Sequence, residues 1–445
     1  LGSGILLVYP AHLNQVKFYD AKSAEITVEA GINFGKLQQL LQSYEHFIPA
    51  APTSLEYSTI GGAVANNAAS RRSFKYGSMR QYVRGLRVVL ANGEVIETER
   101  ISKRELNRKL GLSTFEGEIY RALDALLEEN RSVVEKSRLA VSKNASGYAL
   151  SEIVEKDGSF DLTPLFVGSQ GTLGLITEVT LSSEPYTPKT SLVTSYFTNA
   201  DDLQAAVLEL REQDPVPSAL EMVDSALLEA VAKENPNYLK DVIKPPYPKF
   251  ILLVEFDNIS EHDRSKGAKK AMKILSKHSE NVFNENDPDK QKLVWKIRDA
   301  SALFSGHPQG RSNPLPLIDD GVVQPEKLAS FLSSIYDQFK REHIDVAIWG
   351  SAGDANLHIE PNLDLSQVGD RQKAFRMLEG RLRGPYMSKI YPEDVIQLFA
   401  KVKKIFDPYD TLNPGVKINV SADAVRPLLR DKYSLEHVYD HLPLS

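Results

Sequence analysis

Short β-type runs alternate with turns and helical segments through residue 186 of the chain. GILLVYP, ITVEAG and LRVVLANGEVIE are apolar or alternating runs closed by Gly, Asn or Pro, which predicts strands. EGEIYRALDALLEENRSVVEKS repeats apolar residues at helical spacing and predicts one amphipathic helix. LTPLFVGSQGTLGLITEVTL predicts a strand, a glycine-rich turn and a second strand. We therefore expect residues 1–186 to form one unit of mixed helices and strands.

The pattern changes from residue 187, where helices become more frequent than strands. SLVTSYF and KFILLVEFD predict strands, and the segments between such strands predict amphipathic helices. This order predicts an α+β domain over residues 187–384, in which an antiparallel sheet carries helices on one face. Beyond it we expect a helix ended by the turn FDPYDTLNPG in residues 385–424, and a polar surface helix or arm in residues 425–445.

Length and composition narrow the class of protein. A chain of 445 residues with 42% hydrophobic content is too long for one ordinary domain, so we expect two or three. The net charge of −6 and the lack of a Lys/Arg stripe argue against a nucleic-acid partner. No apolar run approaches the length of a membrane span. The absence of Cys excludes disulfides, thiolate-bound metals, iron–sulfur clusters and Cys nucleophiles, and it favours the cytoplasm.

Three segments of the first unit combine glycine with small or polar residues. In STIGGAVANNAAS, Gly61-Gly62 lets backbone N–H groups approach a bound pyrophosphate, although a tight turn packed on a sheet explains the pair equally well. In FVGSQGTLGLITE, a glycine at every third position leaves room for a flat ring or a phosphate, whereas a β-hairpin turn is the simpler interpretation. In VSKNASGYAL, Lys143 and Asn144 lie in a loop that ordinary turn chemistry also explains.

Taken together and in this order, these segments resemble the FAD-linked D-lactate, glycolate and D-2-hydroxyglutarate dehydrogenases. KYGSMRQYVRGLRVVLANGEV and FDPYDTLNPG are also similar to that family, and the resemblance covers most of the chain. It implies an α+β fold with a two-subdomain FAD-binding domain of the vanillyl-alcohol-oxidase type over residues 1–186. It further implies that residues 187–384 form a cap over the isoalloxazine ring and that residues 385–424 return to the FAD domain.

The resemblance also assigns cofactor-binding residues. The segment after Pro52 would meet the pyrophosphate and the ribityl chain, and the glycine-rich turn would meet the adenine and the flavin. Ser70 is a departure, because the family usually has Gly there. The strand–helix–strand unit that precedes GILLVYP in the family is missing, which we expect to remove a set of phosphate donors. The residues expected to bind FAD are Ser54, Thr59, Ile60, Gly61, Gly62, Asn66, Ala68, Tyr76, Gly77, Asn144, Tyr148, Gly168, Gly171, Thr172, Gly174, Ile176 and Asn413.

The family's cap carries His-x-Gly-Asp-Gly-Asn-x-His, and GSAGDANLH occupies that place here. The resemblance implies that His358 is catalytic and binds a divalent metal, zinc or manganese. Ser351 stands where the family has the other His, and Ala355 where it has Gly, so the ligand set is incomplete. The later Glu-His segment, which supplies the base, is absent between Glu379 and Gly380. Whether this segment is deleted from the protein or omitted from the sequence remains open.

Arg298, in VWKIRDA, matches the cap position where the family has an Arg that reaches the substrate carboxylate. The planar fork of donors on a guanidinium suits a carboxylate. An Arg on a helix can also pair with Asp299 or with another acid at the surface. We expect the first arrangement and count Arg298 as a catalytic residue.

The resemblance implies FAD-dependent oxidation of a D-2-hydroxy acid, such as D-lactate or glycolate, to the 2-keto acid by hydride transfer to flavin N5. Electrons would then pass to a quinone or a cytochrome. We expect a cytoplasmic protein, with peripheral contact at the inner face of the membrane left open. An alternative is a flavin-fold protein that binds a ligand without turnover, because metal ligands and base are missing. A sugar or aromatic-alcohol oxidase is a third hypothesis, against which Arg298 and GDANLH argue.

Overall fold

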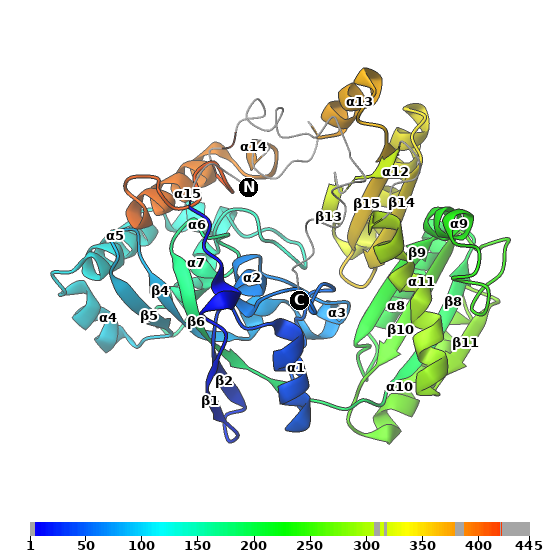
Figure 1. Ribbon diagram of the computed structural model, residues 1–445, viewed down its shortest axis with the longest axis horizontal. Helices are drawn as coiled ribbons and strands as arrows, with labels where there is room; N and C mark the ends of the chain where they lie inside the picture. The colour runs from blue at the N-terminus through cyan, green and yellow to red at the C-terminus, as the bar shows by residue number, and fades with distance from the viewer. Residues whose placement is uncertain (1–4, 307–311, 316–317, 379–386, 419, 421–445) are drawn as a thin grey trace.

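The computed structural model describes residues 5–306, 312–315, 318–378, 387–418 and 420. The described chain forms two bodies, each built on its own sheet, and the C-terminal helices lie against the first body (Figure 1). The expected arm of residues 425–445 and the Glu379–Gly380 junction lie outside the described residues. No helix in the described ranges is both long enough and apolar enough to span a bilayer.

The first sheet has the strand order β1-β2-β6-β4-β5, and every pair in it is antiparallel. Buried and exposed side chains alternate along β5, as in a sheet with one face on a core. The strands expected from ITVEAG and LRVVLANGEVIE are confirmed as β2 and the β4–β5 hairpin. The strands of this body are β1 Val16–Asp20, β2 Glu25–Glu29, β3 His46–Phe47, β4 Val83–Val89, β5 Val95–Glu99, β6 Leu175–Ser182 and β7 Glu184–Pro185.

Helices and short 3₁₀ turns cover this sheet and connect its strands. Thr114 caps α5, the longest helix of this body, because its side chain accepts a hydrogen bond from the Gly117 N–H at 3.3 Å. The helices are α1 Phe34–Ser43, α2 Ile60–Ala65, α3 Ser73–Tyr76, α4 Lys103–Leu110, α5 Phe115–Glu129, α6 Arg131–Lys136 and α7 Thr163–Phe166, and the 3₁₀ turns are η1 Tyr9–Ala11, η2 Met79–Gln81 and η3 Leu150–Glu152.

GILLVYP does not form the strand that its apolar run predicts. Residues 5–8 have no regular structure, Ile5 is 94% exposed, and η1 follows with Pro10 in its first positions. A strand satisfies its backbone by pairing with the edge of a sheet. The edge strand of the described sheet is β1, and residues 5–8 do not pair with it. Proline favours the first turn of a helix instead, because it fixes φ and has no N–H to leave unpaired.

Two other segments also differ from the expected pattern. LTPLF forms the short helix α7 rather than a strand, because Pro164 in its first turn favours helical φ. The glycine-rich turn that follows therefore joins a helix to β6, and the simpler hairpin interpretation is wrong. The single amphipathic helix expected after Glu116 breaks into α5 and α6 at Asn130, whose side chain donates to the Leu126 carbonyl at 2.8 Å.

The second sheet, which forms the cap, is antiparallel throughout and has the strand order β11-β8-β10-β9-β14-β15-β12, with β13 also paired to β15. The strands expected from SLVTSYF and KFILLVEFD are confirmed as β8 and β10. The strands are β8 Ser191–Phe197, β9 Ala219–Asp224, β10 Phe250–Phe256, β11 Val282–Glu285, β12 Asn313–Pro314, β13 Ile318–Val322, β14 Val346–Ser351 and β15 Asn356–Leu363.

Helices cover both faces of the cap sheet, so the expectation of helices on one face is wrong. All seven residues of β10 are buried, with Leu252 and Val254 in one core and Ile251 and Leu253 in the other. An uninterrupted apolar strand needs a helix layer on each face, because its side chains alternate between the faces. The first core holds α8 Ala200–Arg211, α10 Glu261–Leu275 and α12 Leu328–Arg341, and the second holds α9 Ser225–Glu234 and α11 Pro288–Gly306.

The helices after the cap pack into the core of the first body, although they are the last helices described in the chain. Phe399 and Phe406 of α15 Glu393–Phe406 are fully buried there, and Phe406 meets Phe166 edge-on with ring centroids 5.4 Å apart. The remaining elements are η4 Pro325–Lys327, α13 Val368–Leu378 and α14 Met387–Ile390.

Candidate functional site

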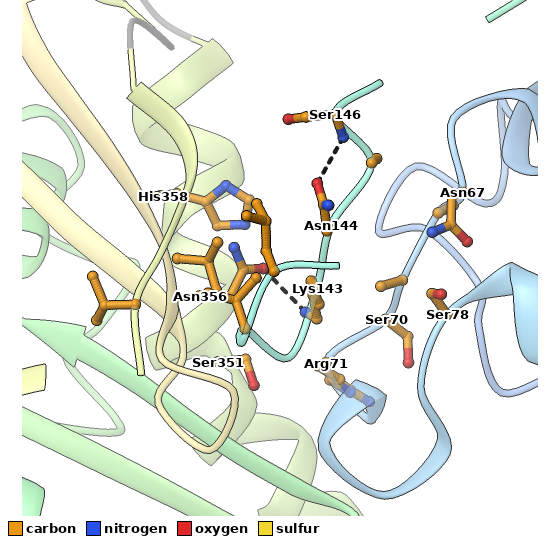
Figure 2. Close-up of a pocket in the computed structure, with 18 of the residues that line it drawn as sticks. Asn67, Ser70, Arg71, Ser78, Lys143, Asn144, Ser146, Ser351, Asn356 and His358 are labelled. Carbon is orange, nitrogen blue, oxygen red and sulfur yellow. Dashed lines mark hydrogen bonds between the residues drawn. The ribbon is translucent and has the colours of Figure 1, made fainter. Parts of the chain in front are cut away.

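A cavity of about 890 Å³ lies where the first body meets the cap, and both contribute side chains to its lining. One wall comes from the turn that follows α2 and from the loop of residues 139–146. The cap supplies residues of β9, α11, β14 and β15. Figure 2 shows Ser351, Asn356 and His358 on the cap side, with Lys143 of the first body pointing toward Asn356. This volume is in the range of pockets that hold cofactors and small ligands.

The short helix α3 fastens the two bodies together beside this cavity. Arg72 Nε donates to Glu255 Oε2 at 2.6 Å, and Lys75 Nζ lies 2.7 Å from Asp257 Oδ1. The Tyr76 hydroxyl donates to Asp257 Oδ2 at 2.9 Å. Burial alone would raise the pKa of Glu255, but the neighbouring guanidinium of Arg72 holds it below its ordinary value. These contacts fix the position of the cap relative to the first body.

His358 lies on β15 beside Trp349 of β14, and the two rings stack with centroids 5.8 Å apart. The hairpin between these strands contains Ser351, which pairs in register with Asn356. Ala355 has a φ of +48°, in the left-handed region that glycine adopts without strain. Ser351, Asn356 and His358 all line the cavity, so GSAGDANLH presents polar side chains to it.

The residues near His358 do not fit a divalent metal. Among the described residues, no group of three or more His, Cys, Asp or Glu side chains is arranged to hold an ion. Asp354 is already engaged, because its Oδ2 accepts from Ser73 Oγ at 2.6 Å and from Ser351 Oγ at 3.2 Å. The same oxygen lies 3.4 Å from Lys143 Nζ. A tight zinc site needs three or four good ligands, which this turn does not supply.

Arg298 is buried in the wall of the cavity, and its partner is Glu221 of β9. Its Nε donates to Glu221 Oε2 at 2.6 Å, and its Nη1 donates to Ser301 Oγ at 2.8 Å. Both charged side chains line the cavity and are less than a tenth exposed. The alternative interpretation, a surface pair with Asp299, is therefore wrong. A guanidinium has five N–H donors, so its remaining donors are available to a ligand in the cavity.

Three of the residues expected to bind FAD line this cavity: Asn66, Ala68 and Asn144. Asn144 is held by its neighbours, because its Nδ2 donates to the Tyr391 hydroxyl at 2.6 Å and its Oδ1 accepts from the Ser146 N–H. The other expected residues lie outside the lining of this cavity, although Tyr148 lines a smaller one beside it.

Gly61 and Gly62 serve close packing in this structure. The N–H of Gly61 donates to the Ala30 carbonyl at 2.7 Å, and the N–H of Gly62 donates to Thr59 Oγ1 at 3.1 Å. A Cβ on Gly61 would lie 2.8 Å from that of Ala30. Ile60 is fully buried, and its N–H donates to Ile32. The tight-turn interpretation accounts for these contacts, so a role of the pair in binding pyrophosphate stays a prediction.

The turn Gly168–Gly174 is held by the C-terminal segment. Asn413 Nδ2 donates to the Gln170 carbonyl at 2.7 Å, and Lys403 Nζ donates to the Thr172 carbonyl at 2.9 Å. Tyr148 bonds Thr172 through their hydroxyls at 2.8 Å. At Gly171, φ is +73° and a Cβ would meet no atom within 4 Å, so the turn is open at this point. These contacts fix the turn that is expected to approach the cofactor.

The remaining expected residues have packing or turn roles in the structure. Gly174 allows close approach, since a Cβ there would lie 2.4 Å from Val88. Ile176 is buried in β6, Gly77 has a φ of +74° after α3, and the Ser54 hydroxyl contacts that of Ser58 at 2.8 Å.

Buried polar atoms near the cavities fit an additional bound group. Arg80 Nε and Ser169 Oγ are buried and have no hydrogen-bond partner among the described residues. Arg80 lines the smaller cavity next to Asn67 and Tyr148. Such orphaned donors are rare in folded proteins unless a ligand or water satisfies them. Together with the volume between the bodies, they agree with a cofactor held by the first body.

The local sequence did not identify Arg71 or the α3 contacts as parts of the site. Arg71 lines the cavity, and its guanidinium lies 4.0 Å from the centre of the Trp295 ring. The adjacent basic residues of RRSFK were a visible signal, but their partners lie more than 180 residues away in the chain. Contacts at that separation cannot be derived from local periodicity.

Comparison with known families identifies the two bodies. A model of the FAD binding domain matches residues 2–99, and a model of the C-terminal domain of FAD linked oxidases matches residues 187–379 and 378–416. The chain belongs to the FAD-linked oxidase family. The second match divides at residues 378–379, where the family's Glu-His segment was expected and not found.

Several FAD-linked dehydrogenases and oxidases are similar along most of this chain. Glycolate oxidase subunit GlcD of Bacillus subtilis is 27% identical over 433 residues, which cover 93% of the chain and 79% of that protein. D-lactate dehydrogenase of Anaerostipes hadrus is 27% identical, with coverage of 93% and 80%. D-2-hydroxyglutarate dehydrogenase of Pantoea ananatis is 25% identical over 479 residues. That alignment covers 100% of this chain but 46% of the relative, so the chain spans about half the length of that enzyme.

Two solved structures, an oxidase and a synthase, share the fold. 4-Ethylphenol oxidase from Gulosibacter chungangensis superposes with a TM-score of 0.62 at 16% identity, covering 93% of this chain and 80% of that one. Alkyldihydroxyacetonephosphate synthase superposes with a TM-score of 0.56 at 15% identity, covering 91% and 65%. These likenesses confirm the expected vanillyl-alcohol-oxidase fold with an antiparallel cap sheet, and they carry no information about substrate.

Proposed function

We propose that this FAD-linked oxidase converts a small D-2-hydroxy acid, of the D-lactate or glycolate type, to its 2-keto acid. The observation that carries the proposal is the lining of the cavity between the two bodies, where Lys143, Arg298 and His358 face one volume. Cationic donors suit the carboxylate of such an acid, and an imidazole suits the proton of its hydroxyl. The names of the relatives, which include D-lactate and D-2-hydroxyglutarate dehydrogenases, support the same substrate class.

Each residue of the proposed site has its own role in the reaction. Arg298 and Lys143 bind the carboxylate and orient the C2–H bond of the substrate. His358 Nε2 or Nδ1 accepts the hydroxyl proton as the carbonyl forms. Bound FAD supplies the hydride acceptor, its N5 atom.

The same proposal includes expectations for the electron acceptor and for the location of the protein in the cell. The electrons would pass to a quinone or a cytochrome, and one relative is named D-lactate dehydrogenase [cytochrome]. The absence of Cys from the sequence supports a cytoplasmic location, and contact with the inner membrane face would suit a quinone acceptor.

An anaerobic absorption experiment tests the proposal. The full chain is reconstituted with FAD and mixed separately with D-lactate, glycolate, D-2-hydroxyglutarate and L-lactate. We expect the flavin bands to bleach with at least one of the first three acids and not with L-lactate. A protein that does not take up FAD, or whose bound flavin stays oxidised with every acid, would contradict the proposal.

The alternative is a flavin-fold protein that binds a ligand without turnover. The observation that favours it is the lack of a metal-binding group among the described residues, together with the division of the family match at residues 378–379. Binding of FAD and of a 2-hydroxy acid without any bleaching is the result that this alternative expects.

A further inference from the structure

Among the described residues around His358, no set of ligands is arranged for a divalent ion, but a positively charged side chain lies beside them. Lys143 reaches from the loop of residues 139–146 into the cavity, and its Nζ donates to Asn356 Oδ1 at 3.1 Å. The same nitrogen lies 3.4 Å from Asp354 Oδ2. Figure 2 shows Lys143 reaching from the first body toward Asn356 of the cap, with a dashed line for their hydrogen bond. The hairpin that carries GSAGDANLH therefore binds an ammonium group.

We propose that the ammonium group of Lys143 takes the place of a metal in this site and binds the carboxylate of the ligand directly. The inference rests on the proposed function for the class of ligand, a small carboxylic acid. The position of the lysine and its contacts do not depend on that proposal.

Asp354 is the counter-ion of Lys143, and three other polar contacts hold this residue in place. Asp354 accepts hydrogen bonds from Ser73 and Ser351, and it is 5% exposed. Its carbonyl accepts from Ser142 Oγ at 2.6 Å, so the residue before the lysine is bound to the same hairpin. Asp354 does not line the cavity, whereas Lys143 does. The carboxylate thus lies behind the ammonium group, and a ligand in the cavity meets the positive charge.

The ammonium group has capacity for a ligand and would oppose a metal. It carries three N–H donors, and the described protein groups within contact distance are Asn356 and Asp354. A third donor is therefore available to a carboxylate oxygen. A divalent cation placed among the same oxygens would lie beside a like charge, which is unfavourable in a partly buried site. Ser351 contributes a hydroxyl, which is a weaker metal ligand than the imidazole that it replaces.

The test measures binding of oxalate, a small dicarboxylate that cannot be oxidised by hydride transfer. The FAD-reconstituted full chain is titrated with oxalate by calorimetry, with and without EDTA. Metal content is measured by mass spectrometry on the same samples. We expect metal well below one ion per chain, and oxalate binding that EDTA leaves unchanged. Metal near one ion per chain, or loss of oxalate binding in EDTA, would overturn the inference.

Two variants of Lys143 and a matched control complete the experiment. Lys143→Met should weaken oxalate binding about 10- to 100-fold, the loss expected for one charged hydrogen bond. Lys143→Arg, which keeps the charge, should bind more tightly than Lys143→Met. The control Lys327→Met removes another lysine of the same cavity, one that is exposed, and should change binding by no more than a few-fold.

The outcomes separate this inference from the proposed function. Lys143→Met could lower thermal stability and still bind oxalate as well as the parent. In that case the lysine only links the two bodies, and the inference is wrong. If Lys143→Met fails to fold, Lys143→Arg and EDTA still decide, because a metal-dependent site responds to EDTA. Oxalate binding through Lys143 in a protein that no 2-hydroxy acid reduces would contradict the proposed function and support this inference.

Discussion

At the scale of single residues, the site depends on contacts between residues that are far apart in the sequence. Ser73 and Asp354 are separated by 281 positions, and their side chains are 2.6 Å apart. His358, Arg298 and Asn144, which the motifs singled out, all line the cavity between the bodies, and their roles stay predictions. The motifs gave no indication that Glu221 would pair with Arg298, or that Lys143 would bind the hairpin. Local spacing constrains neighbours in one element, whereas these contacts depend on how the two bodies meet.

Ala355 has a positive φ in the hairpin beside His358. We expect Ala355→Gly to raise the free energy of unfolding by about 0.5–1 kcal/mol, because glycine relieves a left-handed strain larger than its entropic disadvantage. Denaturant unfolding measures the change. Ala352→Gly is the control, since Ala352 is equally buried and lies outside the left-handed region, and it should destabilise the protein. A loss of stability in Ala355→Gly would contradict the prediction.

Asp224 caps α9 inside the cap domain, where burial raises its pKa from 3.8 to about 7. The folded carboxyl therefore holds its proton more tightly than the unfolded one. Its contribution to stability is fully present below pH 3.8 and is lost as pH rises toward 7, at about 1.4 kcal/mol per unit of pKa difference.

We expect Asp224→Asn to reduce the fall in thermal midpoint between pH 5 and pH 8, compared with the parent. The variant should also be less stable at pH 5, because its amide has one acceptor oxygen. That oxygen cannot serve both the Leu227 N–H, which donates to Oδ1, and the pair of Tyr336 and the Ile348 N–H, which donate to Oδ2. Asp201→Asn, at an exposed position, is the control and should keep the pH dependence of the parent. An unchanged pH dependence in Asp224→Asn would show that the carboxyl is ionised throughout this range.

At the scale of elements, periodicity located most strands and helices but not their surroundings. LRVVLANGEVIE alternates and forms a hairpin with one buried face, as its pattern indicates. LTPLF is as apolar as a strand, and one proline in its first turn makes it a helix. KFILLVEFD is recognisable as a strand, and its unbroken apolar run is typical of a strand that is covered on both faces. The run does not show which helices pack against each face.

Lys403 of α15 joins the C-terminal segment to the glycine-rich turn. Its Nζ is buried and contacts Asp407, the Thr172 carbonyl and the Leu412 carbonyl. Lys403→Met should lower the free energy of unfolding by about 3–5 kcal/mol, because it leaves the Asp407 carboxylate buried without its partner. FAD affinity should fall with it, as measured by flavin fluorescence. The exposed Lys401→Met is the control. An equal loss of stability and of FAD affinity in that variant would contradict the role given to Lys403.

At the scale of the whole molecule, the two bodies are joined by a cluster of buried charges rather than by an apolar seam. Glu255 and Asp257 of the cap are less than a twentieth exposed at their side chains, and they face Lys75 of α3 and Arg72, the residue before that helix. Phe74, between these two basic residues, packs against the core of the cap. The bodies should therefore unfold as one cooperative unit while this cluster is intact.

Arg72→Ala removes the central cation of this cluster and should lower the free energy of unfolding by about 3–5 kcal/mol. It should also divide the calorimetric transition into two, because the cap and the first body then lose their strongest link. The exposed Arg84→Ala serves as the control and should keep a single transition. A single, unshifted transition in Arg72→Ala would mean that the cluster does not hold the bodies together.

The place of α15 has a consequence for the order in which this protein matures on the ribosome. The first body needs Phe399 and Phe406 to complete its core, and these residues are synthesised after the cap. The cap, by contrast, draws its two cores from residues that lie together in the middle of the chain. The nascent cap can therefore consolidate before the first body receives α15 and completes its core.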